Sequence, residues 1–161
     1  VEFGRSLLDR FEPRLARRVD FCARGGSGEV VNALRAMPNT ARIKFIGNLD
    51  GDVRQATPPD VAMRCVYLPG DRAIELIFRE LALSDPQALV DVTGYDRVPA
   101  VLGGLEGRDP HDWYREVATE LGYTKAQFFP FMLALWLRNE ENVVAAKLYV
   151  EALQTALEHR D

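Results

Sequence analysis

The fold depends above all on one stretch of the chain, IKFIGNLDGD at residues 43–52. Its apolar first half is typical of a buried strand, which ends in two aspartates separated by a glycine. Side chains alternate along a strand, so Asp50 and Asp52 lie on the same side of its end. Gly51 lets the backbone turn between them. Two carboxylates aimed at one point repel each other unless a cation lies between them, and Mg²⁺ prefers such oxygen ligands. We therefore predict a metal site here, where ligands collect in open α/β sheets.

Alternating helix and strand patterns surround this stretch. Hydrophobic periodicity predicts a helix over about residues 3–18 and a second one over 30–37. Two further apolar stretches, residues 19–23 and 63–68, are typical of strands, and a glycine turn at residues 25–28 follows the first of them. This order of elements predicts an α/β arrangement with short crossovers.

After Gly70 the strand patterns nearly vanish and helix signals replace them. Asp85 and Asp109 each precede a proline, which is the pattern of an N-cap acid before the first helical position. Thr124 and Gln127 have the spacing of a capping box. The chain is therefore expected to form two parts, which are an α/β core over residues 1–70 and a mainly helical lobe over residues 71–161.

Composition excludes several classes of protein. The chain has 161 residues, of which 47% are hydrophobic and 27% charged, enough for a sizeable core and too apolar for disorder. No apolar run has membrane-spanning length, and the N-terminus is not a signal peptide. Cys22 and Cys65 form no CxxC motif, which points to a reducing cytoplasm rather than to zinc or disulfides. The net charge of −4 argues against a generic DNA-coating protein. Because the chain does not begin with Met, we expect a fragment of a longer protein.

Three features together resemble the Toprim domain of topoisomerases, primases and several nucleases. They are the glycine turn at Gly25-Gly26, the strand ending in Asp50-Gly51-Asp52, and the alternating frame around them. The segment YLPGDRAIE at residues 67–75 looks like the LPG…E segment of the OLD-family (overcoming lysogenization defect) nucleases, which have a helical lobe after it. The resemblance implies a Toprim-like (Rossmann-like) α/β sheet that lacks its first strand and is followed by an α-helical lobe.

The same resemblance implies the chemistry of a metal-dependent DNA endonuclease with two Mg²⁺ or Mn²⁺ ions. Asp50 and Asp52 would hold the first ion together with the Toprim glutamate, which is either Glu2 or a residue upstream of this chain. Glu75 would contribute to the second ion, although a first-turn glutamate favoured by the helix dipole is an equal interpretation. Lys147 would stabilise charge on the phosphate, unless it is an ordinary solvated lysine. An ATPase domain of the same polypeptide would lie upstream, so ATP would act only through a domain absent from this chain.

Other functions remain open at this stage. Other Toprim chemistry would make the chain an RNase, a primase or a topoisomerase. A non-catalytic scaffold would dimerise through the apolar stretch at residues 128–136. A phosphatase of the haloacid dehalogenase type is remote, because Val53 directly follows Asp52 and puts that family's motif out of register.

Overall fold

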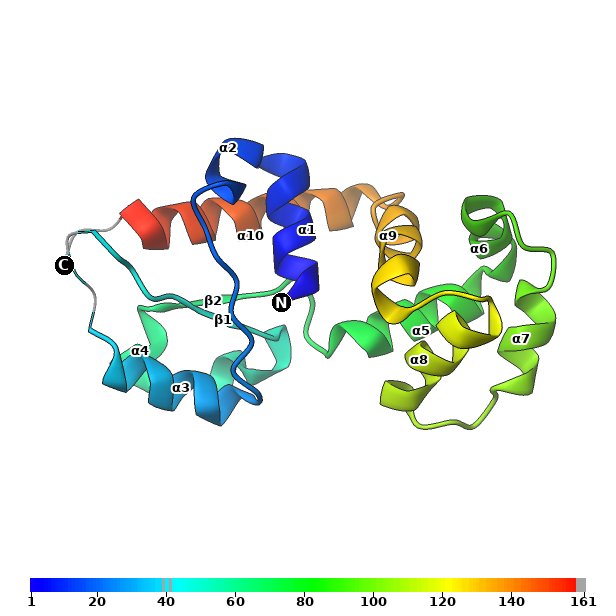
Figure 1. Ribbon diagram of the computed structural model, residues 1–161, viewed down its shortest axis with the longest axis horizontal. Coiled ribbons are helices and arrows are strands. Elements are labelled where there is room, and N and C mark those ends of the chain that lie inside the picture. The colour runs from blue at the N-terminus through cyan, green and yellow to red at the C-terminus, as the bar shows by residue number, and fades with distance from the viewer. Residues whose placement is uncertain (39, 41, 159–161) are drawn as a thin grey trace. The chain divides into compact units, whose positions relative to one another are not determined.

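The computed structural model describes residues 1–38, 40 and 42–158, without the side chains of residues 110 and 111 (Figure 1). It is mostly helical, with 65% helix and 4% strand, and its described strands form a single two-stranded parallel sheet. The predicted α/β Toprim-like (Rossmann-like) sheet is therefore wrong. The chain divides into two compact units, Val1–Arg72 with Val144–Asp161, and Ala73–Val143.

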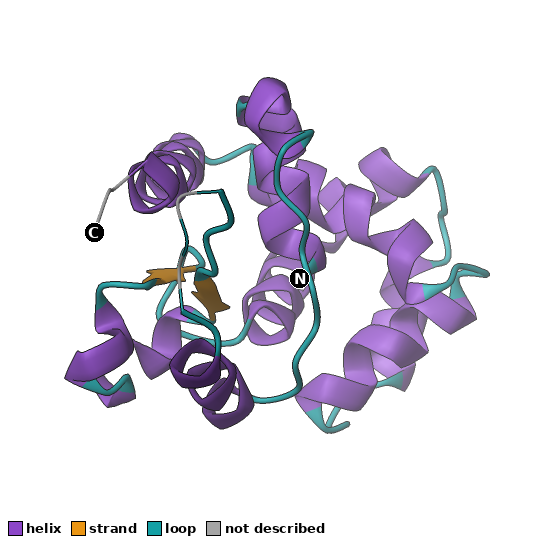
Figure 2. Ribbon diagram, turned by 60° about the vertical axis from the view of Figure 1, so that its left-hand side comes forward, coloured by secondary structure: helices purple, strands orange, loops and turns teal. Residues whose placement is uncertain are grey.

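The first unit contains a short parallel strand pair among helices (Figure 2). Gly47 lies opposite Cys65 and Leu49 opposite Tyr67, so both strands end at the same edge of the sheet. The elements of this unit are α1 (Glu2–Phe11), α2 (Pro13–Ala16), α3 (Ser27–Ala36), β1 (Gly47–Leu49), the 3₁₀ helix η1 (Gly51–Ala56), α4 (Pro59–Ala62), β2 (Cys65–Tyr67) and the part of α10 (Glu140–Glu158) that begins at Val144.

The sheet is smaller than predicted because pairing, and not apolar pattern, defines a strand. Residues 19–23 form no strand, and the stretch at residues 43–52 pairs only over Gly47–Leu49. Ile43 is 56% exposed, so the apolar run is not buried along its whole length. A strand needs a second segment to accept and donate its backbone hydrogen bonds. Periodicity cannot reveal whether that second segment lies alongside.

The predicted helix over residues 3–18 is interrupted at Glu12. α1 ends at Phe11 and α2 begins at Pro13, while Glu12 between them has φ −145° and ψ 68°. Proline disfavours the helical conformation in the residue before it, and it has no N–H to continue the helix. Pro13 instead occupies the first position of α2, where the missing N–H costs nothing.

Arg64 ties the end of α3 to the segment that leads into β1. Its Nη1 donates to the carbonyl oxygen of Leu34 at 2.7 Å, and its Nη2 donates to those of Met37 at 2.6 Å and Phe45 at 3.3 Å. The last carbonyls of a helix have no partner within the helix, so a partly buried guanidinium satisfies them. The adjacent apolar cluster is formed by Val31, Leu34 and Val61, with Val30, Phe45 and Cys65 packed against it.

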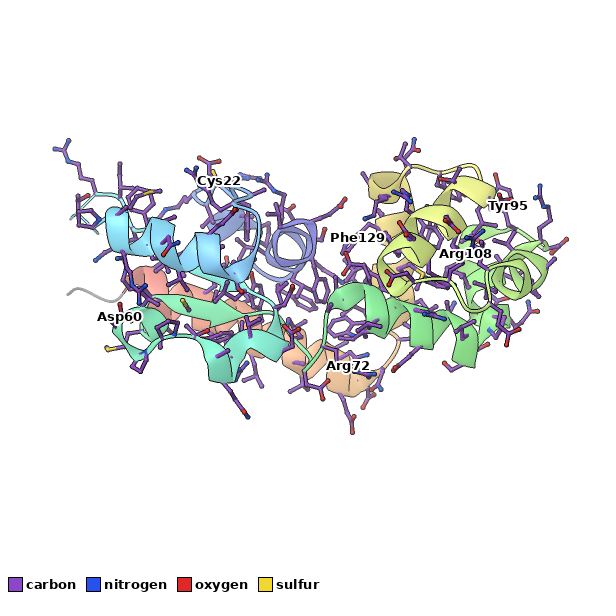
Figure 3. The ribbon with its side chains drawn as sticks, turned by 90° about the horizontal axis from the view of Figure 1, so that it is seen from below. Cys22, Asp60, Arg72, Tyr95, Arg108 and Phe129 are labelled. Atoms are coloured by element: carbon purple, nitrogen blue, oxygen red, sulfur yellow. The ribbon has the colours of Figure 1, made fainter. Side chains whose placement is uncertain are left out.

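The second unit is helical throughout its regular structure. An aromatic cluster lies at its centre, where Phe78 approaches Tyr114 at 6.1 Å and Phe129, labelled in Figure 3, at 5.5 Å between ring centroids. The elements are α5 (Ile74–Ser84), α6 (Pro86–Thr93), α7 (Val98–Gly104), α8 (Pro110–Glu120), α9 (Lys125–Trp136) and the first residues of α10.

Two predicted helix caps in this unit are confirmed. The side chain of Asp85 accepts a hydrogen bond from the backbone N–H of Ala88 at 3.0 Å, at the start of α6. Thr124 and Gln127 form both bonds of the capping box at the start of α9. None of the described helices combines the length and apolar character needed to cross a membrane.

Candidate functional site

Asp50 and Asp52 lie where β1 ends. Asp50 follows the buried Leu49, and η1 begins directly after it at Gly51. Both aspartates are exposed, so the strand delivers their carboxylates to the surface. Asp52 belongs to the first turn of η1 and not to an extended strand. Strand alternation therefore applies only as far as Asp50. The 3₁₀ turn of η1 determines the position of Asp52.

Gly51 brings the two loops that follow the strands into contact. A Cβ at Gly51 would overlap the carbonyl oxygen of Gly70 and would lie 3.0 Å from that of Leu68. The backbone of Gly51 is outside the left-handed region, so the requirement for glycine comes from this close approach alone. The loop with the two aspartates is thus held against the loop after β2.

The first turn of α1 packs on β1 (Figure 1). Gly4 lies against the side chains of Asn48 and Tyr149, and a Cβ at Gly4 would be 2.7 Å from Nδ2 of Asn48. The hydroxyl of Tyr149 in α10 donates to Oδ1 of Asn48 at 3.1 Å. Glu2, exposed in the same first turn of α1, therefore belongs to a helix that is packed on the strand leading to Asp50.

Tyr149 is a positioning residue that sequence reasoning missed. Its side chain is 3% exposed, and burial raises the pKa of its phenol, so the hydroxyl remains a hydrogen-bond donor. The pattern of the last helix marks Tyr149 only as one apolar position among several. Asn48 lies two residues before Asp50, but its hydrogen-bond partner Tyr149 is 101 residues away in sequence.

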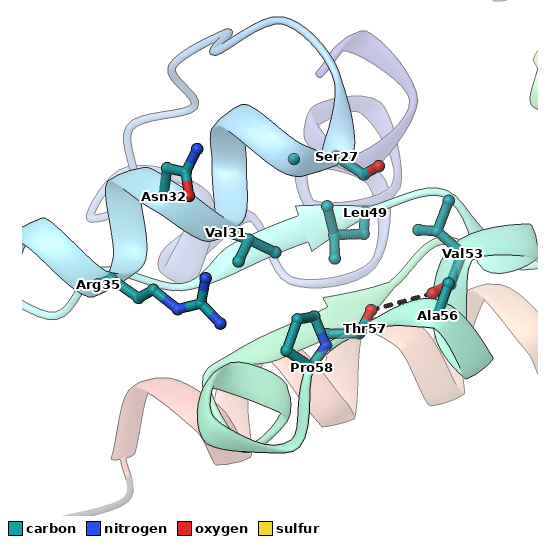
Figure 4. Close-up of a pocket in the computed structure, with 10 residues that line it drawn as sticks. Ser27, Val31, Asn32, Arg35, Leu49, Val53, Ala56, Thr57 and Pro58 are labelled. Carbon is teal, nitrogen blue, oxygen red and sulfur yellow. Dashed lines mark hydrogen bonds between the residues drawn. The ribbon is translucent and has the colours of Figure 1, made fainter.

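An open pocket of about 280 Å³ lies beside the acid pair. Leu49 and Val53, which bracket Asp50-Gly51-Asp52 in the chain, both line it, so pocket and aspartates share one segment (Figure 4). The apolar part of its wall is formed by Val31, Leu49, Val53, Ala56 and Pro58. The neighbouring glycine turn is recognisable in the sequence, but the pocket is not. The wall of the pocket comes from α3 as well as from β1 and η1, which are separate in the sequence.

Polar groups are interleaved with these apolar residues in the wall of the pocket. Nε and Nη2 of Arg35 donate to the carboxylate of Asp60, labelled in Figure 3, at 2.8 and 3.1 Å. These hydrogen bonds lower the pKa of Asp60 below its ordinary value. The hydroxyl of Thr57 donates to the carbonyl oxygen of Val53 at 3.0 Å (Figure 4). The exposed amide of Asn32 and the first residues of α3 complete the polar part of the wall.

The two other predicted site residues belong to other elements of the chain. Glu75 is half-buried in the first turn of α5, which belongs to the second unit. Lys147 is exposed on α10, two residues before Tyr149. Residues two apart in a helix do not share a face, so Lys147 is directed away from the contact between α10 and β1.

The carboxylates of Asp50 and Asp52 suit a Mg²⁺ or Mn²⁺ ion that keeps several of its water ligands. They do not suit an ion whose ligands all come from the protein. Among the residues that the structure describes, no three His, Cys, Asp or Glu side chains are grouped so that they could hold a metal. Mg²⁺ keeps several waters and commonly binds through one or two carboxylates plus substrate phosphates. Two exposed carboxylates beside an open pocket match that requirement.

Comparison with protein families, curated proteins and solved structures finds no match for this chain. The resemblance to the Toprim domain and the OLD family therefore stays a prediction.

Proposed function

We propose that the first unit contains a divalent-metal-dependent nuclease site that hydrolyses phosphodiester bonds in DNA. The observation that supports this most directly is the position of Asp50 and Asp52. They are two exposed carboxylates directly after a buried strand, at the edge where both parallel strands end. Carboxylate oxygens are the ligands that hard divalent cations prefer. The adjacent pocket gives the substrate a place to bind.

Each residue of this site has a specific role. Asp50 and Asp52 bind the cation, whereas a role for Glu2 as a third carboxylate stays a prediction from the resemblance, because no three such groups are brought together among the described residues. A divalent ion so bound would polarise the phosphate and activate water. Gly51 allows the loop that contains both aspartates to lie against the loop after β2. Roles for Glu75 and Lys147 stay predictions from the resemblance.

Nicking of supercoiled plasmid DNA in Mg²⁺ or Mn²⁺ tests the proposal. Asp50→Asn and Asp52→Asn keep the size of the side chain and remove its charge, so each should abolish the metal-dependent rate. Asp71→Asn is the matched control, because Asp71 is an exposed aspartate in the neighbouring loop whose side chain is 92% exposed. Equal nicking by the wild type and Asp50→Asn would show that the activity does not come from this site.

The same assay with a single-stranded RNA of matched sequence distinguishes a DNase from an RNase. We expect cleavage of DNA. Faster cleavage of RNA, with the same dependence on Asp50, would retain the metal site and replace the substrate.

The burial of the predicted apolar surface does not favour the scaffold alternative, which stays untested. That alternative depended on an apolar surface at residues 128–136, but Phe128 and Phe129 are buried. Phe128 approaches Tyr114 at 5.5 Å and Phe129 approaches Phe78 at the same distance, all within the second unit. Side chains that fill a core are not available to a partner.

We place the activity in the cytoplasm, as the cysteines suggest. Cys22 is exposed, and Cys65 is half-buried with its thiol donating to the carbonyl oxygen of Val61. Both are free thiols. Free thiols persist in a reducing compartment.

A further inference from the structure

We propose that the pocket beside Asp50 and Asp52 binds one unpaired nucleobase of the strand to be cleaved, with adenine as the base that fits best. This proposal rests on the proposed nuclease function, because only that function identifies the bound strand as the one that is cleaved. Residues of α3, β1 and η1 that take no part in the cleavage chemistry would form this substrate subsite.

The size and the lining of the pocket suit a single base. Its volume of about 280 Å³ is just below the range of roughly 300–1,000 Å³ typical of drug-sized ligands. Val31 and Leu49 provide an apolar surface on one side, and Val53 and Pro58 provide one near η1 (Figure 4). Enzymes that bind an extruded base commonly hold its flat faces between apolar or aromatic side chains.

The polar part of the wall offers groups for the edge of the base. Asn32 is exposed at the pocket on α3, and an asparagine amide can pair with both N6 and N7 of adenine. Arg35 is held in place by two hydrogen bonds to Asp60, which use Nε and Nη2 and leave Nη1 outside that pair. The carboxylate of Asp60 balances the charge of this guanidinium, whose Nη1 can still donate a hydrogen bond to a phosphate or to the base.

The position of the pocket connects the base to the acids. Leu49 directly precedes Asp50 and Val53 directly follows Asp52, so the pocket and the two acids belong to one short segment of the chain. A base stacked and paired inside a duplex cannot enter such a pocket without leaving its helix. The expected substrate is therefore single-stranded DNA or a nucleotide extruded from a duplex.

Binding of dAMP to the 161-residue chain in the absence of metal tests the pocket. Calorimetry should give at least about tenfold tighter binding of dAMP than of 2-deoxyribose 5-phosphate, as expected for the loss of one stacked base. Ala56→Leu fills the pocket and should weaken dAMP binding about tenfold. Ala36→Leu makes the same change at an exposed alanine of α3 that does not line the pocket, and it should bind dAMP as the wild type does.

A second variant keeps the test decisive if Ala56→Leu disturbs folding. Asn32→Ala changes an exposed helix residue and should also weaken dAMP binding, whereas Glu29→Ala on the same helix should not. Circular dichroism verifies that each variant is folded. Wild-type affinity for dAMP in folded Asn32→Ala, or equal affinity of the wild type for dAMP and the sugar phosphate, would overturn the assignment.

A short single-stranded oligodeoxynucleotide distinguishes a strand from a free nucleotide as the source of the base. Binding that is tighter than that of dAMP, and weakened by Asn32→Ala, supports the strand. Equal affinity for the two would assign the pocket to free nucleotides and overturn the strand assignment.

The pocket and the nuclease site fail separately in these experiments. Asp50→Asn should retain dAMP binding in the absence of metal, because Asp50 does not line the pocket. A wild-type protein that binds dAMP but does not nick plasmid DNA would refute the nuclease alone. Intact, Asp50-dependent nicking without base binding would refute the pocket alone.

Discussion

Replacement of Gly51 by alanine is expected to destabilise the first unit, although it adds only one methyl group. The new Cβ would overlap the carbonyl oxygen of Gly70 and lie 2.9 Å from its carbonyl carbon and 3.0 Å from the carbonyl oxygen of Leu68. All three atoms are backbone, so no side chain can rotate away and the two loops must separate. Overpacking of this kind costs typically about 1–3 kcal/mol. The alanine recovers about 0.4–1 kcal/mol by restricting the unfolded chain. The free energy of unfolding should therefore fall, by up to roughly 2.6 kcal/mol.

Urea unfolding followed by far-UV circular dichroism measures this change. Gly28→Ala in α3 is the matched control, because a Cβ there meets no atom within 4 Å. It should leave stability unchanged or raise it by up to about 1 kcal/mol. If Gly51→Ala proved as stable as Gly28→Ala, the loops after β1 and β2 would not be in close contact. The explanation of how the acid pair is positioned would then be wrong.

Three further changes test how the unit is held together. Arg64→Ala should lower the free energy of unfolding by about 2–4 kcal/mol in the same urea assay, because three backbone carbonyls lose a charged donor; wild-type stability would refute the capping role. Tyr149→Phe should cost about 1 kcal/mol through the lost hydrogen bond to Asn48, and an unchanged midpoint would contradict that bond. Arg35 lowers the folded-state pKa of Asp60, so this pair stabilises the protein above the unfolded aspartate pKa of about 3.9 and its contribution is lost as the pH falls through the lower folded value. The stability difference between the wild type and Asp60→Asn should thus shrink below about pH 4, whereas a difference independent of pH would rule out this linkage.

Local signals in the sequence correctly predicted two helix caps of the second unit. The caps at Asp85 and Thr124 depend on residues three positions apart, so the chain itself contains the complete signal. The break in the first helix was equally local, because Pro13 dictates the conformation of Glu12. That break was missed because the apolar stripe appeared to continue beyond the proline.

Long-range partners could not be predicted from the same patterns. The apolar run before Asp50 indicated a strand, but only its last residues pair with β2, and residues 19–23 pair with no described strand. The surface position of Asp50 and Asp52 followed from the end of the apolar run. Their surroundings did not, because Tyr149 and the pocket residues of α3 come from distant parts of the chain.

Calorimetric titration of the chain with Mn²⁺ measures the proposed metal site itself. We expect binding by the wild type and by Asp71→Asn, with affinity lowered at least about tenfold in Asp50→Asn and in Asp52→Asn, which corresponds to about 1.4 kcal/mol of binding free energy. Equal Mn²⁺ affinity in all four proteins, or no Mn²⁺ binding by the wild type, would contradict the proposed metal site.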